Sequence, residues 1–410
     1  MKSIYNLLKL AARIVPISVV LLFIIATSAC KHSDDEPKDF LADVTINPDG
    51  STSNGSIFIP SSDDSFYLDY VKYKIVENHL EVVDVDKLAL KRDVTIYSPV
   101  TYLGKTYNTR KILSNVFSGC KDITSIMIAN DITSIDRGAF SECYSLKKIT
   151  LPSTLTRIGS FAFGWCNSLR DISIPDNVIV IEPEAFSHCI ALKTIRLSNS
   201  VTEISEKCFY ECNSIEEIAI PESITEINNG AFYGCTSLKK INLPNALTLL
   251  SHECFYGCKS IEEIIIPENV RVLGFSAFYG CTSLKSITLP NAISVIDHSC
   301  FFNCSSLKNI NLHNEVAYIL EHAFDGCVSL KDLVIPNSCE LILEYAFANC
   351  QLTNVVLPAS LHYKAYVNDI SQKVFYNSII ENVEAHLSHW SEDQINSFFE
   401  GADITNLKIY

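Results

Sequence analysis

The chain has 410 residues, 48% of them apolar and 19% charged, so it can build a large core and is too apolar to be intrinsically disordered. Its 47 acidic residues outnumber its 32 Lys and Arg, and the formal charge of −15, without a basic block, excludes nucleic acid as a partner. The 16 cysteines do not predict a disulfide framework, because such frameworks belong to short secreted domains with small cores.

Residues 1–29 have the layout of a signal peptide. Three basic residues and no acidic one accompany an apolar run over residues 14–26, which is too short for a membrane-spanning helix. Residues 27–30, Thr-Ser-Ala-Cys, resemble a bacterial lipobox. That resemblance implies cleavage before Cys30 and attachment of lipid to its sulfur. The alternative is an ordinary secretory peptide followed by a chance cysteine.

Residues 30–56 are predicted to form an acidic tether. Cleavage removes three basic residues and no acidic one, which takes the formal charge from −15 to −18. The acidic run at residues 34–36 directly follows the anchor cysteine and resembles the export signal of Bacteroidetes-type surface lipoproteins. It implies a lipid-anchored protein of the outer membrane, exposed at the cell surface; a merely solvated tether is the alternative. The remainder, rich in Asp, Asn, Ser, Gly and Pro, has a linker composition.

Residues 57–112 are predicted to form an N-terminal cap. From Phe66 to Tyr107 apolar and polar residues alternate in short segments, a pattern typical of β-strands. We expect these strands to cover the apolar end of the repeats that follow.

Residues 113–361 form eleven repeats of one length. The period of 23 is marked by a cysteine in every repeat, without insertion: Cys120, Cys143, Cys166, Cys189, Cys212, Cys235, Cys258, Cys281, Cys304, Cys327 and Cys350. Periods of about 20 to 29 residues with a Leu-x-x-Leu-x-Leu core indicate a leucine-rich repeat solenoid, in which each coil buries its apolar side chains against its neighbours.

One repeat, residues 231–250, predicts the structure of a coil. Alternation over residues 241–243 predicts a short strand of one parallel sheet, ended by Pro244. Phe232 and Cys235 are expected to point inward from turns or a 3₁₀ piece on the opposite side. The ladder cysteines are then small apolar core residues, and the additional Cys208, Cys254 and Cys300 lack the spacing of a structural zinc site.

The repeat motif Ala-Phe-x-x-Cys-x-Ser-Leu-x-x-Ile-x-Leu-Pro resembles the BspA-like leucine-rich repeat family of bacterial surface proteins. The resemblance covers residues 113–361. It implies a solenoid without enzymatic activity and a role in adhesion to host matrix proteins or to other cells.

Residues 362–410 are predicted to hold a degenerate repeat and a small α/β cap. The segment from Phe375 to Ser378 restores the repeat at an offset of 28 rather than 23 residues. Ser391 and Gln394 form a capping box that predicts a short helix to Phe399, with Gly401 at its end. A last strand from residue 404 to 410 is expected to seal the final coil.

An aromatic stripe is the candidate binding surface. One aromatic residue precedes the Gly-Cys, Glu-Cys or Asn-Cys pair in five successive coils, with two more aromatic rings near the same edge in earlier coils: Tyr210, Tyr233, Tyr256, Tyr279 and Phe302, with Trp165 and His188. Tyr and Trp suit contact with protein or glycan. The alternative is that the rings only stack on one another and cover the turns.

The outward strand position is expected to bind poorly. It carries small residues without an aromatic: Thr150, Ser173, Ala219, Asn242, Thr288 and Asn311.

Catalytic and phosphate-binding motifs are absent from the sequence, so we expect no enzyme, metal or cofactor. The sequence therefore predicts a monomeric adhesion or protein-binding surface lipoprotein. A glycan-capturing or scaffold lipoprotein of an outer-membrane uptake system is the alternative.

Overall fold

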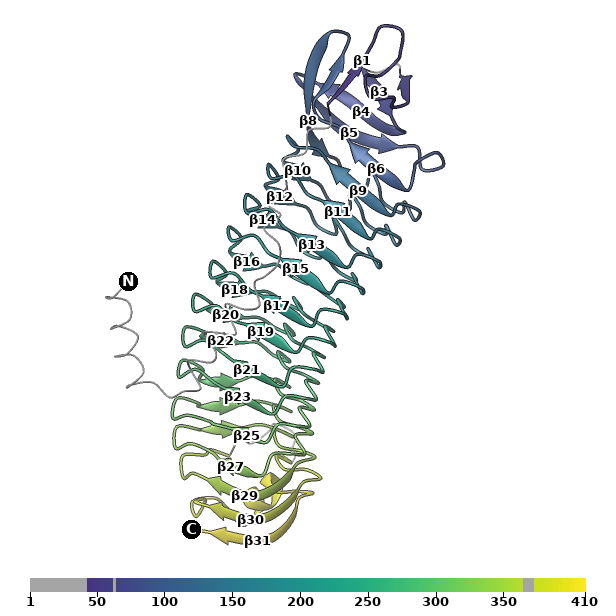
Figure 1. Cartoon of the computed structure of the whole chain (residues 1–410). Coiled ribbons are helices and arrows are strands. Elements are labelled where there is room, and N and C mark those ends of the chain that lie inside the picture. The colour runs from purple at the N-terminus through teal and green to yellow at the C-terminus, as the bar shows by residue number, and fades with distance from the viewer. Residues whose placement is uncertain (1–42, 62–63, 364–371) are drawn as a thin grey trace, which may run out of the picture. The chain divides into compact units, whose positions relative to one another are not determined.

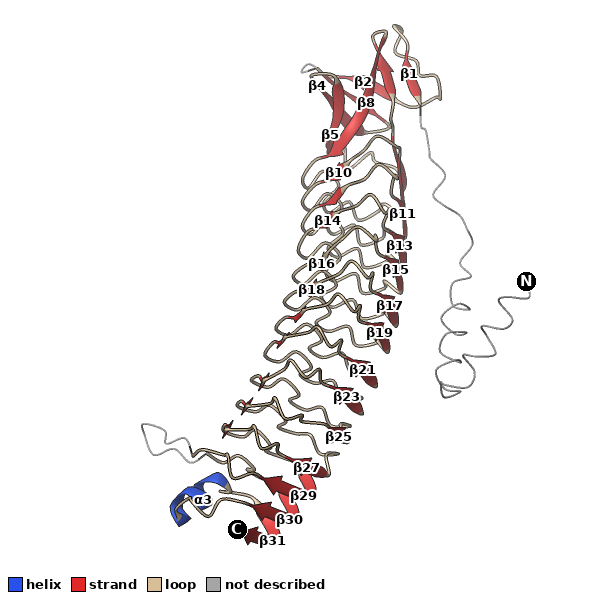
Figure 2. Ribbon diagram, turned by 90° about the vertical axis from the view of Figure 1, so that its left-hand side faces the viewer, coloured by secondary structure: helices blue, strands red, loops and turns tan. Residues whose placement is uncertain are grey.

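The computed structural model describes residues 43–61, 64–363 and 372–410 (Figure 1). The expected signal peptide, the lipid-bearing Cys30 and the first half of the expected tether, to residue 42, lie outside the described residues. The described chain is a solenoid whose coils each contain two short strands and a turn segment, so two rows of parallel strands run along different sides of the stack (Figure 2).

The first row contains the predicted strands. Each pairs with the strand one repeat away, as in Ile218↔Ile241. The central residue of each three-residue strand, which is isoleucine except for Leu333 near the end of the row, is buried, and its two neighbours face outward, as the alternation requires. The strands of this row are β9 (Ser125–Ile128), β11 (Lys148–Thr150), β13 (Asp171–Ser173), β15 (Thr194–Arg196), β17 (Glu217–Ala219), β19 (Lys240–Asn242), β21 (Glu263–Ile265), β23 (Ser286–Thr288), β25 (Asn309–Ile310) and β27 (Asp332–Val334).

The second row was not predicted, because a single parallel sheet was expected. Each of its strands has only two residues and pairs with the equivalent strand of at least one adjacent coil. Its members are β10 (Ser134–Ile135), β12 (Arg157–Ile158), β14 (Val180–Ile181), β16 (Glu203–Ile204), β18 (Glu226–Ile227), β20 (Leu249–Leu250), β22 (Val272–Leu273), β24 (Val295–Ile296), β26 (Tyr318–Ile319) and β28 (Leu341–Ile342). Two residues are too few to show the period-two alternation of a strand in the sequence.

The third side of each coil, which we call the turn face, has no continuous helix. In the coil around Phe232, its N–H donates to Cys254 O of the next coil at 2.9 Å, whereas Cys235 N–H donates back to Phe232 O at 3.1 Å. This alternation between bonds to the next coil and bonds within a turn requires residues of positive φ, here Gly230 at 58° and Gly234 at 71°. Backbone hydrogen bonds thus join the turn segment of each coil to the turn segments of the adjacent coils.

Phenylalanine and cysteine form two buried columns beneath the turn face. Phe232 is fully buried and stacks on Phe209 and Phe255 at centroid distances of 5.4 and 5.6 Å. From Cys143 to Cys350, each thiol of the 23-residue ladder donates to the carbonyl of a phenylalanine in the preceding coil, with Sγ–O distances between 3.1 and 3.4 Å. The cysteines pack inward, as predicted, and also bond adjacent coils.

All fifteen cysteines of the described residues are buried and free of disulfides. Removal from water disfavours the thiolate, so burial raises the pKa of Cys189 to about 12 and that of the Cys235 thiol well above its usual range. Because the thiolate is the reactive form, these side chains are chemically protected in the folded state.

The N-terminal cap begins earlier than predicted. Strand β1 (Val44–Ile46), inside the expected tether, pairs with β7 (Val100–Tyr102), and both its valine and isoleucine are buried. The rest comprises β2 (Phe58–Pro60), β3 (Ser65–Leu68), β4 (Val71–Val76), β5 (His79–Val85), β6 (Asp93–Ile96) and β8 (Lys105–Ile112). Strand β6 pairs with β9 and β8 with β10, so the cap starts both rows of the solenoid and covers the first coil.

The C-terminal segment continues the stack. Phe375 lies on Phe347 at 5.6 Å, which supports the degenerate twelfth repeat, and β29 (Gln351–Leu357), β30 (Ile379–Ala385) and β31 (Asp403–Ile409) extend the first row in parallel. Helix α3 (Glu392–Phe398) has Ser391 as its N-cap, with both bonds of the predicted capping box.

Candidate binding surface

The seven predicted aromatic residues belong to one continuous stack on the turn face. Four tyrosines and a phenylalanine lie one residue before the second positive-φ position of their coils, whereas Trp165 and His188 occupy that position itself, with φ values of 60° and 59°. The centroid distances along the stack are 4.7 Å for Trp165–His188, 5.3 Å for His188–Tyr210, 4.7 Å for Tyr210–Tyr233, 4.4 Å for Tyr233–Tyr256, 4.4 Å for Tyr256–Tyr279 and 4.6 Å for Tyr279–Phe302. We call this stack the aromatic ladder.

The ladder is longer than the sequence stripe. Phe161 adds a ring at its N-terminal end, 5.9 Å from Trp165, and His322, Tyr345 and Tyr376 continue it towards the C-terminus. These coils have two positive-φ positions that lie four residues apart. Trp165 occupies the second position of its coil, whereas Phe161, His322 and Tyr345 occupy the first position of theirs. A search for aromatic residues at both positive-φ positions would have found them.

The faces of the ladder rings are largely occupied. Each central ring has a neighbour above and below, and Arg137 lies over Phe161 at 5.8 Å and Lys373 over Tyr376 at 5.7 Å, which covers the terminal rings with cations. Stacked tyrosines are therefore expected to present ring edges and hydroxyl groups. Tyr233 and Tyr256 are indeed only partly buried.

Acidic side chains flank the ladder. Burial is the main cause of the raised pKa of Tyr210, and the charges of Glu211, Glu253 and Glu184 add to it. The pKa of Glu184 is itself raised by burial, and burial lowers that of His188. Among the described residues, none of these three glutamates has an ion-pair partner. Lys207 opposes these charges at Tyr210, so three glutamates against one lysine leave a net negative charge beside this ring.

The strand face carries larger side chains at the outward position of four coils. Ile265 is 76% exposed in β21, Val334 63% in β27 and Met127 38% in β9, and Arg196 occupies this position in β15. The expectation of small residues, made from six other coils, therefore does not extend to the whole row. The three apolar residues lie at least three coils apart and do not form a continuous patch.

The described residues provide neither a metal-binding cluster nor a membrane-spanning helix. They contain no group of three or more His, Cys, Asp or Glu side chains that could hold a metal ion. In the same part of the chain, no helix has the length and apolar character needed to cross a membrane.

Comparison with known proteins identifies the repeat. The model of the BspA type leucine rich repeat region matches residues 110–235, 156–271, 202–331, 248–379 and 322–410. A leucine-rich repeat protein from Bacteroides ovatus is 26% identical with a TM-score of 0.56, over 84% of this chain and 100% of that one. A leucine-rich cell surface protein from Faecalibacterium prausnitzii is 26% identical with a TM-score of 0.56, over 85% and 99%.

The pneumococcal vaccine antigen PcpA has a similar fold, with 18% identity and a TM-score of 0.56 over 86% of this chain and 98% of that one. None of the curated proteins with which the chain was compared matches it. The family model covers the chain from the first coil to its last residue. The chain therefore belongs to the BspA type leucine-rich repeat family.

Proposed function

We propose that this protein is a non-enzymatic surface lipoprotein that binds a protein partner through the aromatic ladder. The observation that carries the proposal is the continuous row of partly exposed rings across successive coils. Tyr and Trp are the residue types that anchor interfaces, because they bury much area and lose little conformational entropy. A row that follows the stack gives a partner many equivalent contacts.

The ladder favours protein over glycan. Sugars commonly bind aromatic residues by lying on an exposed ring face, and here the neighbouring rings and the terminal cations occupy the faces. Ring edges remain for apolar contact, and the tyrosine hydroxyl groups, which bond one another along the ladder, can make further hydrogen bonds. Glycan capture for an uptake system, the alternative from the sequence, receives no support from this surface.

The unpaired acids around the ladder favour a basic partner. Glu184, Glu211 and Glu253 lie beside the rings, and Lys or Arg side chains of a partner would neutralise them. In this proposal Cys30 carries the lipid, the solenoid is displayed at the outer-membrane surface, and the partner is a matrix or cell-surface protein. The surface location also draws support from the Faecalibacterium relative, which is described as a cell surface protein.

The test is a binding screen. The purified chain is passed over immobilised extracellular matrix proteins and over a glycan array at low and physiological salt. We expect saturable binding to at least one basic protein, weakened by salt because exposed charges are screened. Binding to neutral glycans alone would overturn the proposal.

A further inference from the structure

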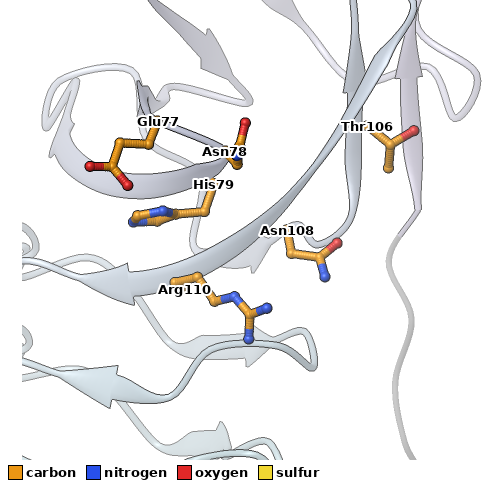
Figure 3. A pocket seen from close by; sticks show the side chains of 6 residues that line it. All are labelled: Glu77, Asn78, His79, Thr106, Asn108 and Arg110. Atoms are coloured by element: carbon orange, nitrogen blue, oxygen red, sulfur yellow. The ribbon is translucent and has the colours of Figure 1, made fainter.

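A polar hollow lies in the N-terminal cap, away from the aromatic ladder. It has a volume of about 320 Å³, at the lower end of the range of small-molecule sites. Glu77 and Asn78 line it from the β4–β5 turn, His79 lines it from the start of β5, and Thr106, Asn108 and Arg110 line it from β8 (Figure 3).

The register of the sheet explains why these side chains meet. Strands β5 and β8 are parallel neighbours in which His79 pairs with Asn108. Successive side chains of a strand alternate between its faces, so Thr106, Asn108 and Arg110 share one face of β8 while Tyr107 and Thr109 are buried on the other. Four of the six lining residues therefore lie on regular strands, and the other two lie in the turn that joins β4 to β5.

The lining combines a free cation with amide and carboxylate groups. Within the described residues, no carboxylate forms an ion pair with the Arg110 guanidinium, and Glu77 likewise has no ion-pair partner. Lys105 brings a second positive charge to the rim, since its Nζ donates to Asn78 Oδ1 at 3.1 Å. A second carboxylate, that of Glu81, lies 3.5 Å from His79 and pairs with Lys111 at 3.7 Å, so its charge is already compensated. Arg110 and Lys105 against the Glu77 carboxylate then leave a net positive charge, which favours an anionic ligand.

We infer that this hollow binds a carboxylate-bearing monosaccharide. The planar guanidinium of Arg110 suits a carboxylate, which accepts two parallel N–H bonds from it. The Asn108 amide can donate to and accept from hydroxyl groups, and the Asn78 amide, whose oxygen accepts from Lys105, can donate to them. The Thr106 hydroxyl bonds Thr101 Oγ1 at 2.9 Å and can make a further bond, and Glu77 accepts from hydroxyl groups. The volume admits one sugar ring, and the polar lining disfavours an apolar ligand. This site is independent of the proposed protein-binding surface.

The experiment is saturation-transfer NMR on the purified full chain with D-glucuronate and N-acetylneuraminate. Glucose tests whether the carboxylate is recognised, and acetate tests whether the sugar hydroxyl groups are. We expect saturable binding of at least one acidic sugar with a Kd on the order of 1 mM, and binding of glucose and acetate at least about tenfold weaker.

Variants locate the site. Arg110→Gln should weaken acidic-sugar binding about tenfold or more, whereas Arg271→Gln, at an exposed arginine of the solenoid, should leave it unchanged. Asn108→Asp places a second carboxylate in the hollow and should also abolish binding. Thermal unfolding shows whether each variant is folded. If Arg110→Gln is not folded, the binding of acidic sugar by Asn108→Asp tests the inference in its place. Equal binding of glucose and glucuronate, no saturable binding, or unchanged binding by the folded variants would overturn the inference.

Discussion

Substitutions of Phe255 and Tyr256, which are adjacent in the chain, compare what the buried phenylalanine column and the aromatic ladder each contribute to the free energy of unfolding. Phe255 is 0% exposed and lies between Phe232 and Phe278 at 5.6 and 5.4 Å. Phe255→Ala removes a buried ring and leaves a cavity that two rigid neighbouring coils cannot fill, which costs about 3 to 5 kcal/mol of unfolding free energy. Tyr256 is next in the chain but partly exposed.

Tyr256→Ala should cost less, because its loss consists mainly of two stacked pairs. Each pair contributes about 0.5 to 1.5 kcal/mol beyond burial, so the expected cost is about 1 to 3 kcal/mol. Tyr256→Phe keeps both pairs and should cost under about 1 kcal/mol; Phe302 shows that the position accepts phenylalanine. Because stacking is lost, serine or alanine variants of the ladder should have a lower free energy of unfolding than the partial exposure of the tyrosines alone would suggest.

Urea unfolding followed by circular dichroism measures these costs, and amide hydrogen exchange shows whether the loss is confined to the mutated coil and its neighbours. Equal costs for Phe255→Ala and Tyr256→Ala would refute the distinction between a core column and a surface ladder. A cost below about 1.5 kcal/mol for Phe255→Ala would refute the role of the phenylalanine column in holding the coils together.

Three further predictions concern the anchor, the core and the thiols. Cys30→Ser should abolish metabolic palmitate labelling, and equal labelling of the variant would rule out the anchor. Leu238→Asp buries an unpaired charge and should prevent cooperative folding, whereas Lys239→Asp at the exposed neighbour should cost little, both measured by urea unfolding. The folded-state pKa of Cys189 is raised from 9.0 to about 12, so its contribution to stability is complete below pH 9 and is lost as the pH rises from 9 to about 12. Cys189→Ala should therefore reduce the decline of the unfolding free energy in this pH range by about 1.4 kcal/mol per pH unit, and an unchanged slope would contradict the buried thiol.

The repeat period accounts for most of what could be predicted. A residue 23 positions away is the spatial neighbour in a solenoid, so the register of one cysteine ladder specifies the strand pairing and the inward positions of every coil. The capping box at Ser391 and Gln394 is equally local, since both partners lie within one turn of helix.

What the sequence did not predict depends on finer geometry. An inward cysteine is compatible with apolar packing alone, so the bond from Cys235 Sγ to Phe209 O at 3.2 Å appears only with coordinates. The two-residue strands of the second row are too short for a recognisable pattern. The hollow of the cap needs residues about thirty positions apart, such as His79 and Arg110, which lie outside the repeat. The rings of Tyr233 and Tyr256 cover each other's faces because their side chains pack across adjacent coils, which the sequence does not specify.

The most direct test of the proposed function is the affinity of the protein partner for a ladder variant and for a strand-face variant. Tyr233→Ser with Tyr256→Ser should weaken binding by about 1 kcal/mol or more for each residue, roughly thirtyfold together, while thermal unfolding confirms that the variant is folded. Ile265→Ser, at the exposed strand face, should bind like the unmodified chain. Unchanged affinity of the folded ladder variant, or a comparable loss for Ile265→Ser, would contradict the assignment of binding to the ladder.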